Sequence, residues 1–278
     1  MGRFSGKSVC YVRFGCAVES RSGFKKIRRM GGRYGSKRRD RKGICDSVGR
    51  KGLNVVLIAR NLDKTEAVAR DISTRFNIQT KVISLDIGKM GPENVHQMRN
   101  ELQNLNIALL VNNAGTAAGV GNFLTTGSDE DVAGIVNLNA RGVVMISRAV
   151  LPLMIAKKKG EKRYVINVGA IFGGVNPSPG LTVYGATKAF LDSFSIALHH
   201  EYKDQGIFVQ SYIPGATKTS LMFKELEGHP LVAMPEQAVA GALAHLGLRS
   251  RTYGHWKTAL CGWYHSWKNV NEAYIPHV

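Results

Sequence analysis

The sequence predicts an α/β fold in which helices cover both faces of a parallel, doubly wound sheet. From residue 44 onward, short apolar runs of strand length alternate with segments of helical periodicity. The chain has 278 residues, of which 44% are hydrophobic, enough for one large buried core. Its four cysteines show no paired spacing, so neither a disulfide scaffold nor a metal site is expected.

The alternation defines a series of strands and helices in a fixed order. The expected strands are 53–59, 80–85, 107–111, 164–168 and 207–213, and the expected helices are 63–76, 92–105, 129–158, 183–202 and 237–246. No apolar run approaches the ~20 uninterrupted residues of a membrane-spanning helix. Ligands of doubly wound sheets bind beyond the carboxyl ends of the strands. The candidate site therefore follows the strands: Arg60, Asp86, the turn at 112–115, the loop after Val168, and Pro214-Gly215.

The net charge of +18 is concentrated at the amino-terminus, where residues 1–52 hold 16 Lys/Arg against three Asp/Glu. Apart from one short candidate strand at 8–12, residues 1–43 show little apolar periodicity. Three interpretations remain open for them: a disordered basic tail, an organelle transit peptide, or a segment that is not the true protein sequence. A nucleic-acid-binding arm is disfavoured, because only Phe24 and Tyr34 accompany the charges. The expected domain is 44–250, followed by an aromatic extension at 251–278.

The run Tyr-Gly-Ala-Thr-Lys at 184–188 places Tyr184 and Lys188 on one helical face. A phenol with a pKa near ~10 is a poor acid or base at neutral pH. An ammonium group one turn away is expected to lower that pKa. Such a pair suits the interconversion of a carbonyl and an alcohol, although a surface pair is the alternative.

Other motifs accompany this pair in a fixed order. They are Asn112-Asn113-Ala114-Gly115 after a strand, Asn139 in the next helix, and Pro214-Gly215-Ala216-Thr217-Lys218-Thr219 after a later strand. Together they resemble the short-chain dehydrogenase/reductase family over residues 44–250, which implies a Rossmann-like fold. The phrases at 150–154, 183–195 and 209–221 are most similar to the branch of 3-oxoacyl-CoA reductases and 17-beta-hydroxysteroid dehydrogenases.

The resemblance implies roles for individual residues. Tyr184 exchanges the proton with the substrate oxygen, Lys188 binds the nicotinamide ribose, and Asn139 anchors a water in the proton relay. The implied cofactor site comprises Arg60, Asp86, Asn112, Ala114, Gly115, Tyr184, Lys188, Pro214, Gly215 and Thr219. A basic residue at position 60 favours a 2′-phosphate, so the implied cofactor is NADP(H).

Two departures from the family pattern accompany these matches. The glycine-rich phosphate loop and the strand before it are missing or replaced, since the glycines at 31–43 lack both the spacing and a preceding strand. Ala170 stands where the family has a serine that hydrogen-bonds the substrate oxygen. Two explanations are open: a damaged gene model of an active enzyme, or a pseudo-enzyme.

Aromatic residues recur in the last 28 residues, with Trp256, Leu260, Trp263 and Trp267 on one side of a helix. Three interpretations of this side are open: it packs on the domain core, it forms a lid over the substrate, or it contacts a membrane surface. By resemblance, the helices at 129–158 and 183–202 pair across a homodimer. Endoplasmic-reticulum membrane is the implied location, with cytoplasmic or organellar alternatives.

The predicted function is NADP(H)-dependent interconversion of a ketone and a secondary alcohol, with a 3-oxoacyl-CoA or a steroid-like lipid as substrate. The alternative is a catalytically impaired fold that binds a lipid or a partner protein. Asn139, Tyr184 and Lys188 favour the enzyme, whereas the Gly169-Ala170 pair and the absence of the glycine-rich phosphate loop favour the alternative.

Overall fold

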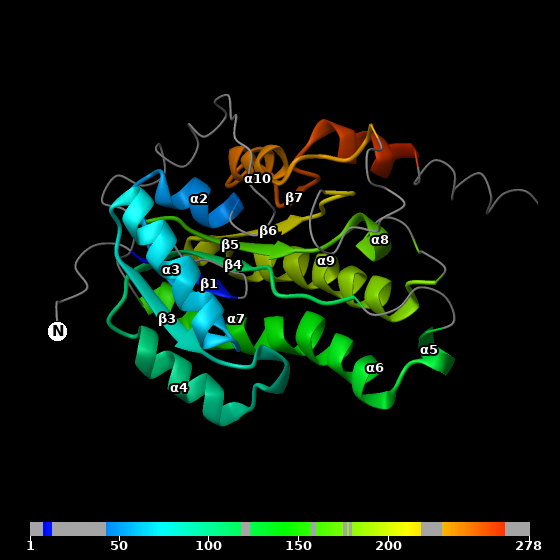
Figure 1. The fold of residues 1–278 in the computed structure, drawn as a ribbon. Helices are drawn as coiled ribbons and strands as arrows, with labels where there is room; N and C mark the ends of the chain where they lie inside the picture. Colours follow the sequence, from blue (N-terminus) through cyan, green and yellow to red (C-terminus); the bar gives the residue numbers. More distant parts are fainter. Residues whose placement is uncertain are drawn as a thin grey trace, which may run out of the picture.

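The computed structural model describes residues 8–12, 43–117, 123–156, 160–174, 177, 180–217 and 230–264. Figure 1 shows a single sheet between two layers of helices. The fold prediction is confirmed: the sheet is parallel and has seven strands in the order β3-β2-β1-β4-β5-β6-β7. The strands are β1 Ser8–Val12, β2 Asn54–Ala59, β3 Thr80–Ser84, β4 Ile107–Asn112, β5 Arg163–Val168, β6 Ile207–Tyr212 and β7 Arg251–Thr252.

The strand β1 lies at the centre of the sheet, although its flanks are basic and show no periodicity. It pairs in parallel with β2 from Ser8–Asn54 to Val12–Ile58, and with β4 on its other edge. The slot between β2 and β4 offers backbone partners on both edges, and a five-residue run containing two valines and a tyrosine is long enough to fill it. The first strand is therefore replaced by Ser8–Val12. The segment that would hold a glycine loop, residues 13–42, lies outside the described residues.

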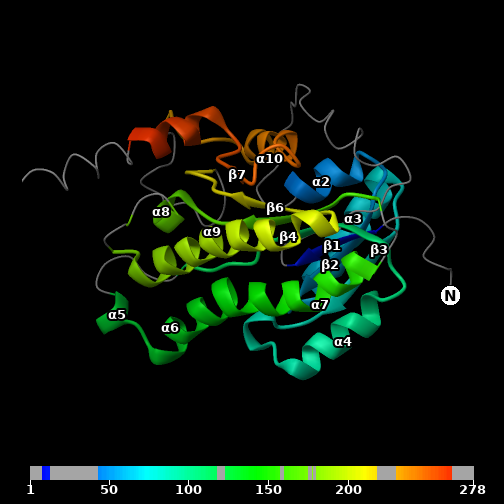
Figure 2. The same ribbon diagram turned by 180° about the vertical axis from the view of Figure 1, so that it is seen from behind.

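The helices divide between the two faces of the sheet, as Figures 1 and 2 show from opposite sides. One face carries α2 Gly43–Gly49, α3 Leu62–Phe76 and α10 Pro235–Ala244. The other carries α4 Pro92–Leu102, α6 Asp129–Val136, α7 Gly142–Ala156 and α9 Thr182–Tyr202. Strands buried on both sides explain the unbroken apolar runs, such as Val55–Ala59, in which every residue is buried.

Elements too short for periodicity escaped the sequence analysis. They are α5 Phe123–Thr126, α8 Ile171–Gly174, and the short helical turns η1 Ile87–Lys89, η2 Asn137–Arg141 and η3 Lys203–Gln205. Of these, η2 is a π-helical turn that joins α6 to α7. By length and composition alone, the continuous helical span from 129 to 156 is long and apolar enough to cross a membrane. This span was not identified from the sequence as such a candidate, because only uninterrupted apolar runs were considered. Half of its most apolar window is buried within the domain, where α7 packs on β4.

Residues 251–264 are built onto the sheet. β7 pairs with the end of β6 at Ser211–Arg251 and Tyr212–Thr252, and residues 256–264 then form a helix. Gly241 of α10 lies so close to Gly254 that a Cβ at position 241 would overlap the Gly254 carbonyl. This backbone contact fixes the path of the chain from β7 into the carboxyl-terminal helix.

Candidate active site

The helix α9 carries Tyr184 and Lys188 one turn apart, with the Lys188 Nζ atom 5.6 Å from the centre of the Tyr184 ring. Lys188 is 4% exposed, and its Nζ donates a hydrogen bond of 2.9 Å to the carbonyl of Val168 at the end of β5. The ammonium group is therefore held at the carboxyl edge of the sheet, which excludes the simple surface pair.

Burial controls the acid–base behaviour of this pair. Desolvation raises the pKa of Tyr184 to about 12 and lowers the pKa of Lys188 from 10.5 to about 8. The expectation that the lysine lowers the tyrosine pKa is wrong for this chain by itself. The reason is that burial disfavours the charged form of each group.

Asn139 lies in the π-helical turn and is fully buried. Its Oδ1 accepts a hydrogen bond from the backbone N–H of Thr116 (2.8 Å). Its Nδ2 donates to the Thr116 carbonyl (2.9 Å) and to the Thr187 hydroxyl (3.1 Å). Thr187 in turn donates to the carbonyl of Tyr184. Asn139 thus ties the loop after β4 to α9, and π-helical turns often mark functional sites.

A chain of buried amides and hydroxyls crosses the sheet beneath this point. The Asn112 Nδ2 donates to Asn167 Oδ1 (2.8 Å) and to the Ser147 hydroxyl (3.3 Å). The Asn167 Nδ2 donates to the Ser195 hydroxyl (2.9 Å) on α9. Asn112 is the last residue of β4, and Asn167 is the penultimate residue of the neighbouring strand β5. The chain of bonds therefore links α7, the carboxyl ends of both strands and α9.

The loop after β5 is the place of the missing serine. Ala170 is 7% exposed, and its neighbours donate backbone hydrogen bonds to the next strand end, from Gly169 to Tyr212 and from Ile171 to Pro214. The loop then presses on α9: Gly173 has φ +105°, and a Cβ there would lie 1.9 Å from the Gly185 carbonyl. Ala170 therefore lies at the site, but it brings a methyl group instead of a hydroxyl.

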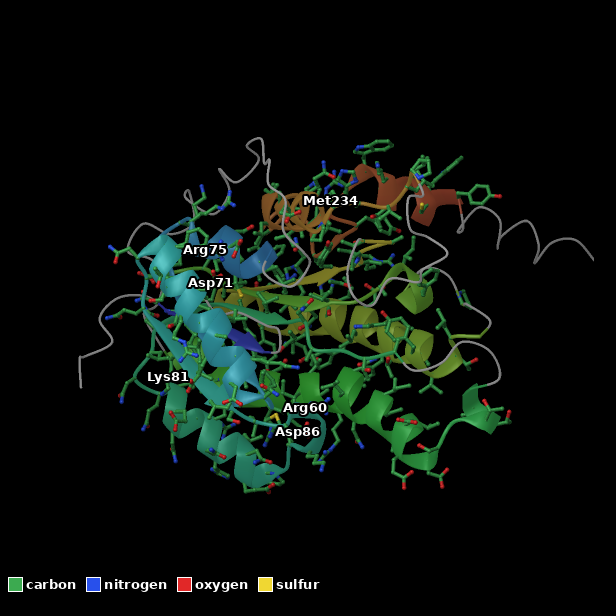
Figure 3. All side chains as sticks on the ribbon, in the orientation of Figure 1. Arg60, Asp71, Arg75, Lys81, Asp86 and Met234 are labelled. Carbon is green, nitrogen blue, oxygen red and sulfur yellow. The ribbon has the colours of Figure 1, made fainter. Side chains whose placement is uncertain are left out.

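Arg60 and Asp86 lie at the carboxyl ends of β2 and β3, close together in Figure 3, where the Leu85 N–H bonds the Ala59 carbonyl. Arg60 is exposed. Asp86 accepts a hydrogen bond from the Gly88 N–H and begins η1. This turn packs against the π-helical turn, since a Cβ at Gly142 would meet Ile87. The two residues thus lie at the same edge of the sheet as Asn139.

Most predicted site residues meet at this edge. Gly115 lies against the amino and amide groups, because a Cβ there would be 3.3 Å from Lys188 Nζ and 3.4 Å from Asn139 Oδ1. Ala114 is buried beside it, and Pro214 and Gly215 follow β6. Thr219 lies outside the described residues.

Three polar residues of the site were not assigned a role from sequence: Thr187, Asn167 and Ser195. Thr187 stands inside the Tyr184–Lys188 motif, and its place there was the one available signal.

The comparisons with known proteins agree with this geometry. The family model described as short chain dehydrogenase matches residues 42–229. The chain belongs to the short-chain dehydrogenase family. This short-chain dehydrogenase is 36% identical to the very-long-chain 3-oxoacyl-CoA reductase of Anas platyrhynchos over 80% of this chain and 70% of that protein.

It is also 34% identical to the inactive hydroxysteroid dehydrogenase-like protein 1 of Pongo abelii, over 84% of this chain and 71% of that protein. The matches span about two thirds of the length of such relatives, from 66% to 71%. Among solved structures, a short-chain dehydrogenase from Sphingobium yanoikuyae in complex with NADPH superposes with a TM-score of 0.67 at 23% identity. That superposition covers 84% of this chain and 91% of the other, and it shows the shared fold.

Proposed function

We propose that this chain is an NADP(H)-dependent reductase that converts a ketone to a secondary alcohol. The observation that carries the proposal is the set of contacts that joins Tyr184, Lys188 and Asn139 at the carboxyl edge of the sheet. When bound, a nicotinamide cofactor supplies the hydride. Tyr184 supplies the proton to the ketone oxygen, which balances the reduction.

The acid–base state of the pair suits proton donation to a ketone oxygen. With its pKa raised to about 12, Tyr184 is protonated at neutral pH and ready to donate. Oxidation of an alcohol would need the phenolate, which burial disfavours. Lys188, with a pKa of about 8, is mostly protonated at pH 7 and can replace the proton or bind a ribose hydroxyl.

The residues present fit a dinucleotide. Gly115 leaves free the space that a Cβ would fill beside Lys188 and Asn139. Asn112 Oδ1 is buried and, among the described residues, has no hydrogen-bond partner. Asp86 and exposed Arg60 would bind the adenosine end, and the guanidinium of Arg60 suits a 2′-phosphate. Gly115 and Lys188 would hold the nicotinamide riboside, next to Pro214 and Gly215.

A second function is favoured by Ala170. A methyl group cannot donate a hydrogen bond, and the loss of one donor to a developing oxyanion costs about 10²–10³ in rate. A chain that keeps the fold but lacks this donor could serve as a lipid- or protein-binding module. The name of one relative, an inactive hydroxysteroid dehydrogenase-like protein, is consistent with this alternative.

The substrate class is proposed from the relatives. The 3-oxoacyl-CoA reductase named among them favours a 3-oxoacyl thioester, and a steroid-like ketone is the second candidate. The same likeness favours an endoplasmic-reticulum location over a cytoplasmic or organellar one. A homodimer through α6 and α9 is proposed as well, since Val136 and Phe190 are exposed there at 44% and 41%.

Binding and turnover of NADPH test the two functions separately. We expect saturable NADPH binding in a fluorescence titration of the full chain, and slow reduction of a 3-oxoacyl-CoA. Ala170→Ser is expected to raise kcat by about 10²-fold and to leave the Kd of NADPH unchanged. Ala170→Gly is the matched control, because it alters the same position without adding a donor. Binding without turnover in Ala170→Ser would leave the binding module as the function, and no binding in any variant would refute the reductase.

A further inference from the structure

The helix formed by residues 256–264 turns its apolar side outward. Trp256, Leu260, Trp263 and Tyr264 are 65%, 47%, 64% and 51% exposed. They stand at positions i, i+4, i+7 and i+8, which is one face of a helix. We call them the aromatic face. A surface helix normally buries its apolar stripe against the core. This stripe is exposed instead, so the interpretation that it packs on the core is wrong. Trp267 lies outside the described residues.

Contacts made by other residues of the same helix hold the aromatic face in this orientation. Thr258 is 2% exposed, and its hydroxyl accepts a hydrogen bond of 3.3 Å from the Gly215 N–H. The Lys257 Nζ donates to the carbonyl of Pro230. Gly262 lies against the ring of Tyr253, where a Cβ would be 2.9 Å away. The exposure of the aromatic face is thus built into the fold, and ring-bearing side chains project from the orange-red helix in Figure 3.

The charge of the surrounding segment indicates what covers this face. Residues 237–271 contain four Lys/Arg and no Asp/Glu. Arg249 is exposed, and the Arg251 side chain, which is paired with Asp192, is 43% exposed. Tryptophan and tyrosine rings favour the boundary between lipid tails and water, and neighbouring cations add attraction to anionic headgroups. We propose that the aromatic face docks the protein onto an anionic membrane surface.

A second copy of the chain is a poorer occupant of the same face. A twofold-symmetric contact sets each patch against its own copy. Arg249 and the other cations of this segment would then meet the same cations of the second copy, and like charges would repel. An anionic lipid surface offers the complementary charge and an apolar layer together.

The position of the aromatic face links docking to the site. Thr258 is bonded to Gly215, which follows Pro214, and the Pro214 carbonyl accepts the N–H of Ile171 beside Ala170. A docked chain would therefore hold this end of the sheet next to the lipid. The benefit for a lipid ketone rests on the proposed function, whereas docking itself requires no catalysis.

The tryptophans of this chain make docking directly measurable. All three lie in this segment, at 256, 263 and 267, so the intrinsic tryptophan emission reports on it alone. The probe is a vesicle of phosphatidylcholine with about 30 mol% phosphatidylserine, compared with pure phosphatidylcholine. We expect a blue shift and co-flotation of the full chain with the anionic vesicles, and at least several-fold weaker binding in about 0.5 M NaCl.

Matched variants separate docking from loss of folding. The double variant Trp256→Ser/Trp263→Ser is expected to bind anionic vesicles at least about tenfold more weakly by flotation, with unchanged thermal unfolding. Leu124→Ser is the apolar control, because Leu124 is 62% exposed on α5, and the sheet lies between α5 and the orange-red carboxyl-terminal helix in both ribbon views. Arg249→Gln should weaken binding by roughly fivefold on anionic vesicles, whereas Arg70→Gln on α3 should not.

Two outcomes would overturn the proposal. The first is an unshifted emission maximum with anionic vesicles, or equal flotation of the tryptophan variant and the Leu124 control. The second is a dimer in sedimentation velocity that dissociates in the tryptophan variant, which would make a second copy the occupant. Neither outcome depends on NADPH binding, so failure of docking and failure of the reductase are distinguishable.

Discussion

The two halves of the sheet are held together by different interactions. On the side of β4, β5 and β6, buried side chains hydrogen-bond across layers, as Asn112, Asn167 and Ser195 do. On the side of β2 and β3, the contacts described between two side chains are mostly surface ion pairs, such as Arg75 with Asp46 and Asp71, and Lys81 with Glu101. Figure 3 shows Arg75 and Asp71 side by side on α3.

This difference teaches how the chain divides its tasks. A buried hydrogen-bond network specifies one arrangement, because breaking any of its bonds would leave a buried polar group without its partner. Exposed ion pairs specify little, since water and salt replace them. The half that would move a proton is thus fixed in detail. The half that would bind the adenosine end relies on apolar strands and on exposed Arg60.

The largest expected effect separates chemistry from cofactor binding. Tyr184→Phe keeps the ring and removes the proton donor, so we expect kcat for ketone reduction to fall by about 10³-fold or more. The Kd of NADPH should change less than about twofold, since the adenosine end is bound by the other half. Tyr202→Phe, at the end of the same helix, is the control and should retain activity. Turnover retained in Tyr184→Phe would remove this residue from the mechanism.

Glycines with positive φ test how tightly each half is packed. Gly173 (φ +105°) lies in the half that holds β4, β5 and β6, and an added Cβ would be 1.9 Å from the Gly185 carbonyl. Gly52 (φ +68°) precedes β2, and nothing lies within 4 Å of its Cβ position. We expect Gly173→Ala to lower the free energy of unfolding by more than about 3 kcal/mol. Gly52→Ala, with backbone strain alone, should cost about 1 kcal/mol. Equal losses in urea denaturation would contradict the close contact of the loop with α9.

Lys188, which is buried in the half that holds β4, β5 and β6, should reduce the free energy of unfolding in a pH-dependent way. Lys188 has a pKa of about 8 when folded and 10.5 ordinarily. The loss in free energy of unfolding that comes from burying the charged Lys188 is therefore fully present below pH 8. Between about pH 8 and 10.5 the unfolded chain binds more protons, so stability rises with pH. Lys188→Met should gain about 2 kcal/mol at pH 7, which is less than the full shift implies because the Val168 carbonyl loses its partner.

The gain in Lys188→Met should shrink toward pH 10, as measured by urea denaturation at several pH values. Lys81→Met is the matched control in the other half, where Lys81 is 30% exposed and paired with Glu101. It should show no such gain. A gain in Lys188→Met that is the same at pH 7 and pH 10 would mean that packing, and not charge, sets the cost.

The sequence predicted the fold well because buried parallel strands leave unbroken apolar runs. The run at 53–59 became β2, and the strand-end motifs placed Asn112, Tyr184 and Lys188 at one edge. Elements that depend on distant partners could not be predicted. Ser8–Val12 has no local signal that it belongs between β2 and β4. Its place depends on an open slot that strands far along the chain create.

The candidate site was predicted in its members but not in its electrostatics. The spacing of Tyr184 and Lys188 suggested a lowered tyrosine pKa, whereas burial raises it. Sequence spacing reports which groups are neighbours, but desolvation depends on everything packed around them. The same holds for Asn167 and Ser195, which are bonded across 28 positions of the chain. The π-helical turn at Asn139 likewise has no periodicity that a sequence could display.

The smallest expected effect compares one polar contact from each half. Ser195 is fully buried and accepts the Asn167 Nδ2 hydrogen bond, so Ser195→Ala leaves a buried amide donor unpaired. We expect a loss of about 1–3 kcal/mol in the free energy of unfolding. Arg70 of α3 pairs with Glu66 at 3.4 Å, and its side chain is 72% exposed. Arg70→Ala should therefore cost less than about 0.5 kcal/mol.

Urea midpoints at constant m-value measure both losses on the same scale. Salt adds an internal control, since about 0.5 M NaCl should remove the effect of Arg70→Ala and leave that of Ser195→Ala unchanged. If the two substitutions lower the free energy of unfolding equally, the two halves do not differ in how their polar contacts stabilise them. The network from Ser147 to Ser195 would then not hold α9 in place. If the buried contact alone matters, the helix that carries Tyr184 and Lys188 is fixed by side chains outside the reacting groups, because the network ends on that helix.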